Sequence, residues 1–161
     1  MIVMKVTLNL LFFIFFSILQ ANSQNTGIEK SAFYTALASG NKTEIEAQLT
    51  IVKESAVTEK NAYEGTLLMK KAQLVSKPKD KLKLFKTGRS KLESSISSNK
   101  ENTEYRFLRL IIQEHAPKIV KYRKDLEEDS RLIRSNYKSL SSELQQIISD
   151  YSKKSNILKI N

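Results

Sequence analysis

The sequence predicts a single all-α domain, built either as an irregular bundle of about seven helices or as a short stack of helical hairpins. Three observations support this prediction. The chain has 161 residues, a length typical of one domain. Apolar side chains recur at helical spacing through most of it, and no segment alternates as a strand would. With 4 glycines and 2 prolines, it has too few turn residues for a barrel or a sandwich.

The composition also excludes several kinds of chemistry. Without cysteine the chain has no disulfide, no thiolate nucleophile and no iron–sulfur or cysteine-based zinc site. Its single histidine excludes most metal sites and catalytic triads that depend on this residue. We therefore expect no catalytic residue, no metal and no cofactor.

The N-terminal segment predicts export. Lys5 precedes the apolar run Leu8–Leu19, and Gln20–Ser23 then offers small residues for a cleavage site. The run is about twelve residues long, whereas a membrane-spanning helix needs about twenty, so cleavage is favoured over a retained anchor. We expect residues 1–23 to be a cleaved signal peptide. The mature chain is then periplasmic or secreted, with no stable transmembrane anchor.

The rest of the chain divides into a flexible lead (24–27), an all-α domain (28–155) and a C-terminal tail (156–161). The domain opens with a helix over 28–39, in which four apolar residues share one face. Gly40 can end this helix because glycine adopts the left-handed conformation without a steric penalty.

Capping residues and a proline mark the next helices. Asn41 or Thr43 can cap the second helix, and Thr58 can begin the third. Pro78 separates the third helix from the fourth, because it disfavours helix at the residue before it. Asp80 can then cap the fourth helix. Its expected buried stripe consists of Leu82, Phe85, Leu92 and Ile96.

The fifth helix is predicted to be the central one. Its segment Tyr105–Ile112 is apolar on nearly all sides, which is typical of a buried helix. Pro117 stops it. Two more helices follow, one over 126–140 and a last one that Ser141 or Ser142 can cap.

Part of the fourth helix resembles a tetratricopeptide repeat. Gly88, Leu92 and Ser95, followed by the turn Asn99–Asn102, match the small–large–small spacing of that repeat's second helix and its exit turn. The resemblance covers half of one repeat, and it implies stacked helical hairpins.

Three other segments are similar to small exported all-helical proteins of Gram-negative bacteria. These segments are residues 63–72, 105–114 and 150–155. The similarity implies a location in the cell envelope and implies no activity.

A narrow polar strip crosses the apolar fifth helix. Arg106, Arg109 and Gln113 stand at positions i, i+3 and i+7, so they share one face, and Arg89 interrupts the stripe of the fourth helix in the same way. A buried arginine needs an acceptor, because an unpaired buried charge is very costly. The strip predicts either an ion-pair network or a clamp for a ligand carboxylate or phosphate. The expected acidic partners are Glu64, Glu93 and Glu104.

Most of the positive charge is concentrated in one segment. The chain has 27 Lys and Arg against 17 Asp and Glu, and residues 70–91 hold nine of these cations but one acid, Asp80. Such a localised excess directs a field toward anionic ligands. Alternatively, it reflects a general abundance of lysine on a solvated surface. The candidate polyanion-binding residues are Lys70, Lys71, Lys77, Lys79, Lys81, Lys83 and Lys86.

The acidic residues do not predict a catalytic pair. Glu127, Glu128 and Asp129 are consecutive, so they point in different directions around a helix, and we expect them to form a solvated charged face. The pair Glu114–His115 lacks the second histidine that a zinc-binding helix requires.

Together these patterns favour an exported, non-catalytic binding or scaffold protein of the cell envelope that contacts a protein partner. The alternative is polyanion binding through residues 70–91, with lipopolysaccharide, acidic polysaccharide or DNA as the ligand. A remote alternative is hydrolysis of an envelope polymer. Sequence-specific recognition of nucleic acid is not expected, since no helix-turn-helix, zinc finger or aromatic stacking platform is recognisable.

Overall fold

A computed structural model describes residues 27–160 of the chain. The expected signal peptide and all of the expected lead except Gly27 lie outside these residues. Within them the chain forms seven α-helices, two short 3₁₀ helices and no strand, which confirms the all-α prediction. The elements are α2 (Lys30–Ser39), α3 (Lys42–Glu54), α4 (Lys60–Leu74), α5 (Pro78–Ser98), α6 (Thr103–His115), η1 (Lys118–Val120), α7 (Leu126–Asn136), η2 (Tyr137–Ser139) and α8 (Ser142–Ser152).

Local capping explains where several helices begin and end. Gly40 ends α2 in the left-handed conformation, with φ 66°. Asn41 caps α3 because its side chain accepts hydrogen bonds from the backbone N–H groups of Thr43 and Glu44, at 2.9 and 3.4 Å. Ser141 caps α8 in the same way, through the backbone N–H of Leu144.

Two predicted helix starts are wrong. Asp80 does not cap α5: the helix begins at Pro78, and Asp80 lies within its first turn. Proline suits the first helical position because its missing N–H would have no partner there. Helix α4 begins at Lys60, two residues after Thr58, and its N-cap residue, Glu59, makes no side-chain capping bond.

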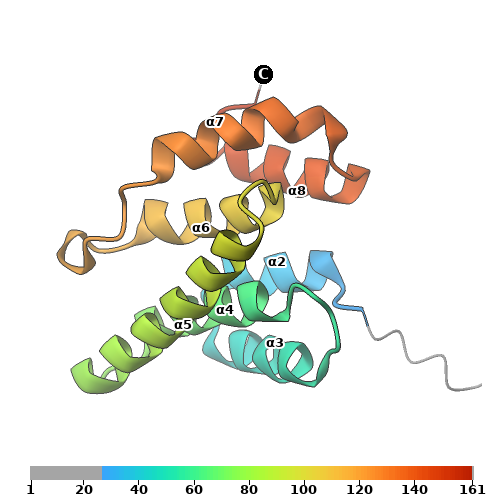
Figure 1. Cartoon of the computed structure of the whole chain (residues 1–161). Helices are drawn as coiled ribbons and strands as arrows, with labels where there is room; N and C mark the ends of the chain where they lie inside the picture. Colours follow the sequence, from blue (N-terminus) through green and yellow to red (C-terminus); the bar gives the residue numbers. More distant parts are fainter. Residues whose placement is uncertain (1–26, 161) are drawn as a thin grey trace, which may run out of the picture.

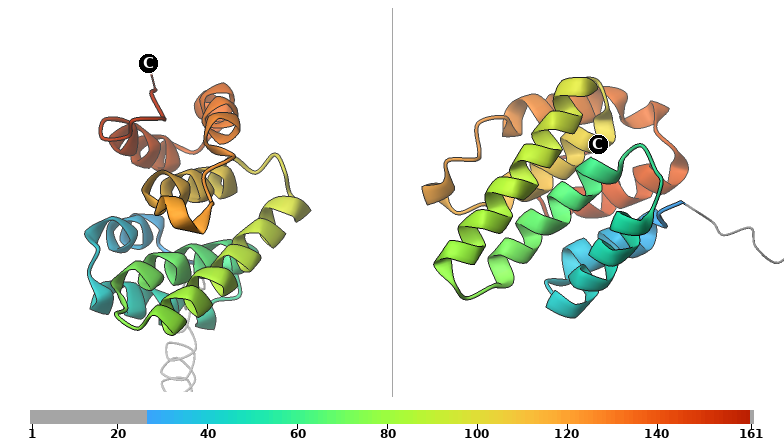
Figure 2. Two further views of the ribbon diagram at one scale, coloured as in Figure 1. Left: turned by 90° about the vertical axis from the view of Figure 1, so that its left-hand side faces the viewer. Right: turned by 60° about the horizontal axis from the view of Figure 1, so that its bottom comes forward.

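The helices form an irregular bundle around α6 (Figure 1). Helices α4 and α5 make the most extensive pairing and lie side by side in all three views (Figures 1 and 2). Helix α6 contacts α4 and α5 on one side and α7 on the other, and α2 contacts α8 across the bundle. This last contact joins the two ends of the described chain, whereas the units of an open stack contact only their neighbours.

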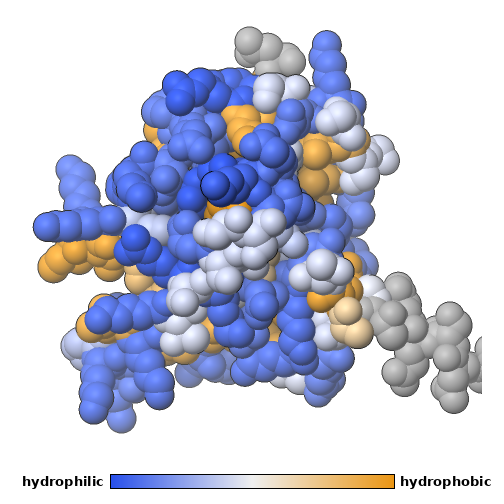
Figure 3. Space-filling view, in the orientation of Figure 1, coloured by the Kyte–Doolittle hydropathy of each residue, from blue (hydrophilic) through white to orange (hydrophobic). Residues whose placement is uncertain are grey.

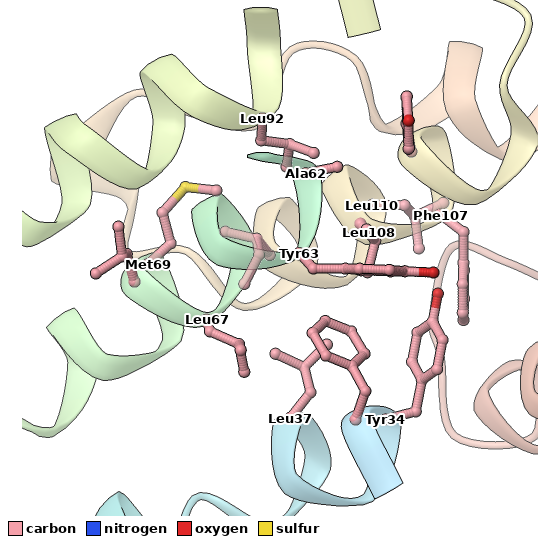
Figure 4. Packing of buried hydrophobic residues seen from close by; sticks show 14 of the residues in the cluster. Tyr34, Leu37, Ala62, Tyr63, Leu67, Met69, Leu92, Phe107, Leu108 and Leu110 are labelled. Carbon is pink, nitrogen blue, oxygen red and sulfur yellow. The ribbon is translucent and has the colours of Figure 1, made fainter. Parts of the chain in front are cut away.

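Helix α6 is central, as its apolar sequence indicates. Phe107, Leu108 and Leu110 are fully buried, and they meet side chains from α2, α4 and α5 (Figure 4). Aromatic rings fill much of this core: the ring centroids of Phe33 and Tyr63 are 4.6 Å apart. No helix between residues 27 and 160 combines the length and hydropathy needed to cross a bilayer.

Two glycines allow α4 and α5 to approach each other closely. A Cβ atom added to Gly65 would lie 2.6 Å from the backbone oxygen of Gly88 and 2.9 Å from the backbone nitrogen of Leu92. Both contacts involve backbone atoms, which cannot rotate away. The small residues are therefore a steric requirement of this helix pair.

The C-terminal segment is part of the fold. Leu158 is fully buried, so the structured domain extends past the expected limit at residue 155. The Glu114 carboxylate holds this segment: it accepts hydrogen bonds from the Tyr151 hydroxyl (2.7 Å), the Ser155 hydroxyl (2.8 Å) and the Asn156 backbone N–H (2.6 Å). Burial by itself raises the pKa of Glu114, but these hydrogen bonds outweigh it and the pKa is lowered.

Replacing Gly65 with alanine should destabilise the bundle. The added methyl forces α4 and α5 apart, and overpacking of this kind costs about 1–3 kcal/mol, against less than about 1 kcal/mol gained from alanine's helix preference. Urea denaturation of Gly65→Ala should show a clear net loss in the free energy of unfolding. The exposed Ser90→Ala variant of α5 is the control and should change it by less than about 0.5 kcal/mol. Equal stabilities of the two variants would contradict the close contact.

The anchor at Glu114 should make stability depend on pH. A carboxyl with a lowered pKa stabilises the fold above its ordinary value of 4.5, and this contribution is lost as the pH falls through the folded-state pKa. Glu114→Gln should therefore reduce the free energy of unfolding by about 1 kcal/mol at neutral pH and by less in acid. Thermal denaturation across this pH range measures the effect. The exposed Glu54→Gln variant is the control, and its stability should depend on pH as that of the unmodified protein does. If the stability of Glu114→Gln also differed from that of the unmodified protein by a constant amount at every pH, the anchor would be contradicted.

Candidate functional site

A groove of about 610 Å³ lies between the first half of α5 and the loop that follows α6. In Figure 1 both segments lie at the left of the molecule, the loop above the start of α5. The groove lining comes from α4, α5 and the loop, and it includes no acidic residue. The lining residues are Ala72, Gln73, Pro78, Lys81, Leu82, Phe85, Lys86, Arg89, Pro117, Ile119 and Val120.

The groove has an apolar floor that is partly open to solvent. Phe85 is buried, but Leu82 is 51% exposed and Ile119 is 88% exposed. The prediction that Leu82 belongs to the buried stripe of its helix is therefore wrong. Phe85, Leu92 and Ile96 are buried as expected, whereas Leu82, near the start of α5, is half exposed at the edge of the groove.

Two basic segments meet around this groove. They are residues 77–86 and 118–124, which together we call the cationic end. It presents nine exposed cations and one exposed acid, Asp80, and none of these cations forms an ion pair with another residue in 27–160. Figure 3 shows hydrophilic side chains projecting at this edge, with hydrophobic atoms between them. The cations are Lys77, Lys79, Lys81, Lys83, Lys86, Lys118, Lys121, Arg123 and Lys124.

The two other candidate polyanion-binding lysines do not line this groove. Lys71 pairs with Glu46 of α3 at 2.8 Å. Lys70 is half-buried on α4, and this burial lowers the pKa of its ammonium group. Of the seven lysines named from the sequence, five therefore belong to the cationic end.

Tyr122 anchors the loop after α6. Its side chain is buried, its hydroxyl donates a hydrogen bond to Glu93 at 2.5 Å, and its ring meets Phe85 edge to face at 5.7 Å. Burial, together with the Glu93 carboxylate, raises the pKa of Tyr122. Arg89, expected among the buried ion pairs, instead places its guanidinium 4.7 Å from the centre of the Tyr122 ring. The base of the loop is thus fixed, while Ile119 stays exposed.

The arginine strip of α6 closes on acidic residues of α7. Asp129 is fully buried, and its two carboxylate oxygens accept hydrogen bonds from Nε and Nη2 of Arg109, each at 2.7 Å. Arg106 donates one further hydrogen bond to Asp129 and another to Glu128, each at 3.1 Å. The expectation of a solvated face is therefore wrong for Asp129, whereas Glu127 and Glu128 are exposed.

The ion pair between Arg109 and Asp129 affects the pKa of both groups. Burial by itself lowers the pKa of Arg109, but the hydrogen bonds and charge of Asp129 outweigh it and raise that pKa. Burial raises the pKa of Asp129 overall, although both guanidinium groups act in the opposite direction. Three hydrogen bonds from two arginines identify Asp129 as an ionised carboxylate.

Gln113 continues the strip toward the groove. Its amide donates to the Asp125 carboxylate at 2.9 Å, and its carbonyl oxygen accepts from the Asp125 backbone N–H at 3.2 Å. Arg109 also reaches Glu93 at 3.1 Å, a partner that the sequence analysis expected. These contacts hold both ends of the loop segment from Tyr122 to Asp125.

The two other expected acidic partners lie elsewhere. Glu64 pairs with Lys91 at 3.1 Å. Glu104 binds Lys30 and accepts hydrogen bonds from the hydroxyl groups of Tyr34 (3.2 Å) and Tyr63 (2.8 Å). Glu104 thus joins α2 to α4 and α6 inside the core and has no contact with the arginines.

A second groove, of about 510 Å³, lies between α2 and α8 and includes two carboxylates, Glu143 and Asp150. A glycosidase pair needs one carboxyl whose pKa is raised by an apolar pocket. Here a hydrogen bond from Lys153 lowers the pKa of Asp150 instead. Asp150 is therefore poorly suited to act as a general acid.

Two parts of the site were not predicted from the sequence. The basic segment 118–124 was not predicted to belong to the site because it is short and follows a proline. Asp125 and Asp129 are four residues apart, so they share a helical face that could have been matched to Arg106 and Arg109.

Between residues 27 and 160 no three acidic or histidine side chains are grouped so that they could hold a metal ion. Comparison of the chain with family models, curated proteins and solved structures finds no match.

Replacing Asp129 with asparagine should strongly destabilise the protein. The amide keeps the shape of the side chain but leaves two buried guanidinium groups without their main counter-charge, which costs about 3–5 kcal/mol. Urea denaturation measures this loss. Glu127→Gln, an exposed change two residues earlier, is the control and should stay within about 0.5 kcal/mol of the unmodified protein. A loss below about 1 kcal/mol for Asp129→Asn would show that the network is not structural.

Proposed function

We propose that the chain is an exported, non-catalytic binding protein of the cell envelope, and that its cationic end binds an anionic ligand. The observation that carries the proposal is the convergence of two basic segments, 77–86 and 118–124, on one groove. Their fields add because Asp80 is the one exposed acid among nine cations. Asp125 and Asp129 face Gln113 and the arginines of α6 instead. A localised field of one sign attracts ligands of the opposite sign and speeds their association.

The proposal of export is based on the sequence of residues 1–23, which has the pattern of a signal peptide. The non-catalytic character is supported by the groove lining, which offers cations and apolar groups but no acid or histidine. In the second groove, the lowered pKa of Asp150 argues against a hydrolase of envelope polymers.

A second candidate function is contact with a protein partner through the same groove. The exposed side chains of Leu82 and Ile119 favour it, because a polymer that offers only negative charge would make no use of them. Exposed apolar groups that share one groove are typical of interaction sites.

Heparin is a suitable polyanion probe for the cationic end. The triple variant Lys79→Glu, Lys83→Glu, Lys86→Glu should weaken heparin binding by about two orders of magnitude at low salt. It should also reduce the slope of log K against log salt by about three, since fewer counterions are released. Isothermal titration over a salt series measures both quantities.

The matched control carries the same change in charge elsewhere on the molecule: Lys42→Glu and Lys53→Glu on α3 and Lys138→Glu on η2, all at exposed positions. It should bind heparin nearly as well as the unmodified protein. If both triple variants lose binding equally, the net charge and not the cationic end is responsible, and the proposed site is wrong.

A further inference from the structure

We propose that the cationic end docks on the surface of a lipid bilayer that carries anionic headgroups. Ile119 and Leu82 enter the interface, and the surrounding lysines contact the headgroups. This inference rests on the proposed function and names its ligand.

The apolar part of the argument is the placement of two side chains. Among residues 27–160 three large hydrophobic side chains are exposed, and two of them, Leu82 and Ile119, line this one groove. The third, Ile51, lies on α3. Ile119 belongs to the short η1 turn between Pro117 and Lys121, on a loop that projects from the bundle (Figure 1). A projecting apolar side chain can enter a bilayer interface without any rearrangement of the core.

The charged part of the argument is the distribution of cations around those side chains. Lys118 and Lys121 flank Ile119, and Lys81, Lys83 and Lys86 surround Leu82 along α5. Their long side chains can reach headgroup phosphates while the apolar groups lie deeper. Each lysine close to an anionic bilayer surface increases partitioning by roughly fivefold, and nine cations are available.

A bilayer explains both features better than the other ligands. Lysine is depleted in protein–protein interfaces, so a groove with five nearby lysines is an unusual place for a protein partner. A soluble polyanion explains the lysines but leaves Ile119 and Leu82 without a role. An anionic bilayer takes the charges at its headgroups and the apolar side chains at the boundary of its acyl chains.

The loop is also held in a geometry that suits docking. Tyr122 is fixed by Glu93, Phe85 and Arg89, so Ile119 and Leu82 keep their relative position on the two sides of one groove. Little conformational freedom then remains to be lost when both side chains enter the interface.

The test uses the protein purified in its exported form and two kinds of vesicle, one of phosphatidylcholine alone and one of equimolar phosphatidylcholine and phosphatidylglycerol. Flotation should show partitioning to the anionic vesicles only. The double variant Ile119→Ser, Leu82→Ser should weaken this partitioning by about tenfold or more, because two apolar side chains no longer leave water. Ile51→Ser, a matched loss of an exposed isoleucine, should leave it unchanged.

A fluorescent reporter follows insertion directly. The chain contains no tryptophan, so Ile119→Trp introduces a single one. Its emission should shift to shorter wavelength with anionic vesicles and become accessible to quenchers carried on the acyl chains. Ile51→Trp is the control and should show neither change.

The outcomes separate the two proposals. If vesicle partitioning does not depend on Ile119 and Leu82, but heparin binding depends on Lys79, Lys83 and Lys86, bilayer docking is wrong and polyanion binding stands. If neither ligand binds in a way that depends on these lysines, both proposals fail. If Ile119→Ser abolishes retention of a specific protein while anionic vesicles do not bind, the groove serves a protein partner and bilayer docking is overturned.

Discussion

The bidentate pair between Arg109 and Asp129 is the interaction on which the rest of this structure depends. Moving two charges out of water costs several kcal/mol for each ion, and that cost is offset only where the geometry is good and the remaining hydrogen bonds are made. Both conditions hold here, since Arg109 binds both carboxylate oxygens and Arg106 adds a further hydrogen bond. The pair therefore allows one arrangement of α7 against α6, and this arrangement determines where the intervening loop can lie.

The same interaction explains why the outer surface at this end is so strongly positive. Glu93, Asp125 and Asp129 turn inward, where arginines of α6 and the hydroxyl of Tyr122 satisfy them. The lysines of the loop and of α5 then face solvent, with Asp80 as the one exposed acid among them. Because Glu93, Asp125 and Asp129 pair in the interior, the exposed surface at this end carries an excess of cations. The proposals for polyanion binding and for bilayer docking both depend on this excess.

Local features of the structure follow from the sequence. The helical periods, the caps at Asn41 and Ser141 and the glycine end of α2 concern residues within a few positions of one another, so a sequence pattern records them directly. The buried position of α6 follows in the same way, because a helix that is apolar on nearly all sides has no face suited to water. Two further features each belong to a single helix: the shared face of Arg106, Arg109 and Gln113 on α6, and the concentration of lysines on α5.

Contacts between distant segments were decided by the tertiary structure alone. A helical period shows which residues share a face, but it does not show which neighbour covers that face. This is why Leu82 is exposed although it continues the stripe of Phe85 and Leu92. For the same reason, the sequence did not show that Asp129 pairs with Arg109. Nor did it show that Glu104 accepts hydrogen bonds from Tyr34 and Tyr63. The sequence by itself determined the helices, the concentration of cations in residues 70–91 and the need of the arginines for acidic partners. The fold alone decided which acids those are and that segment 118–124 joins the lysines of α5, because both depend on how helices far apart in the chain come together.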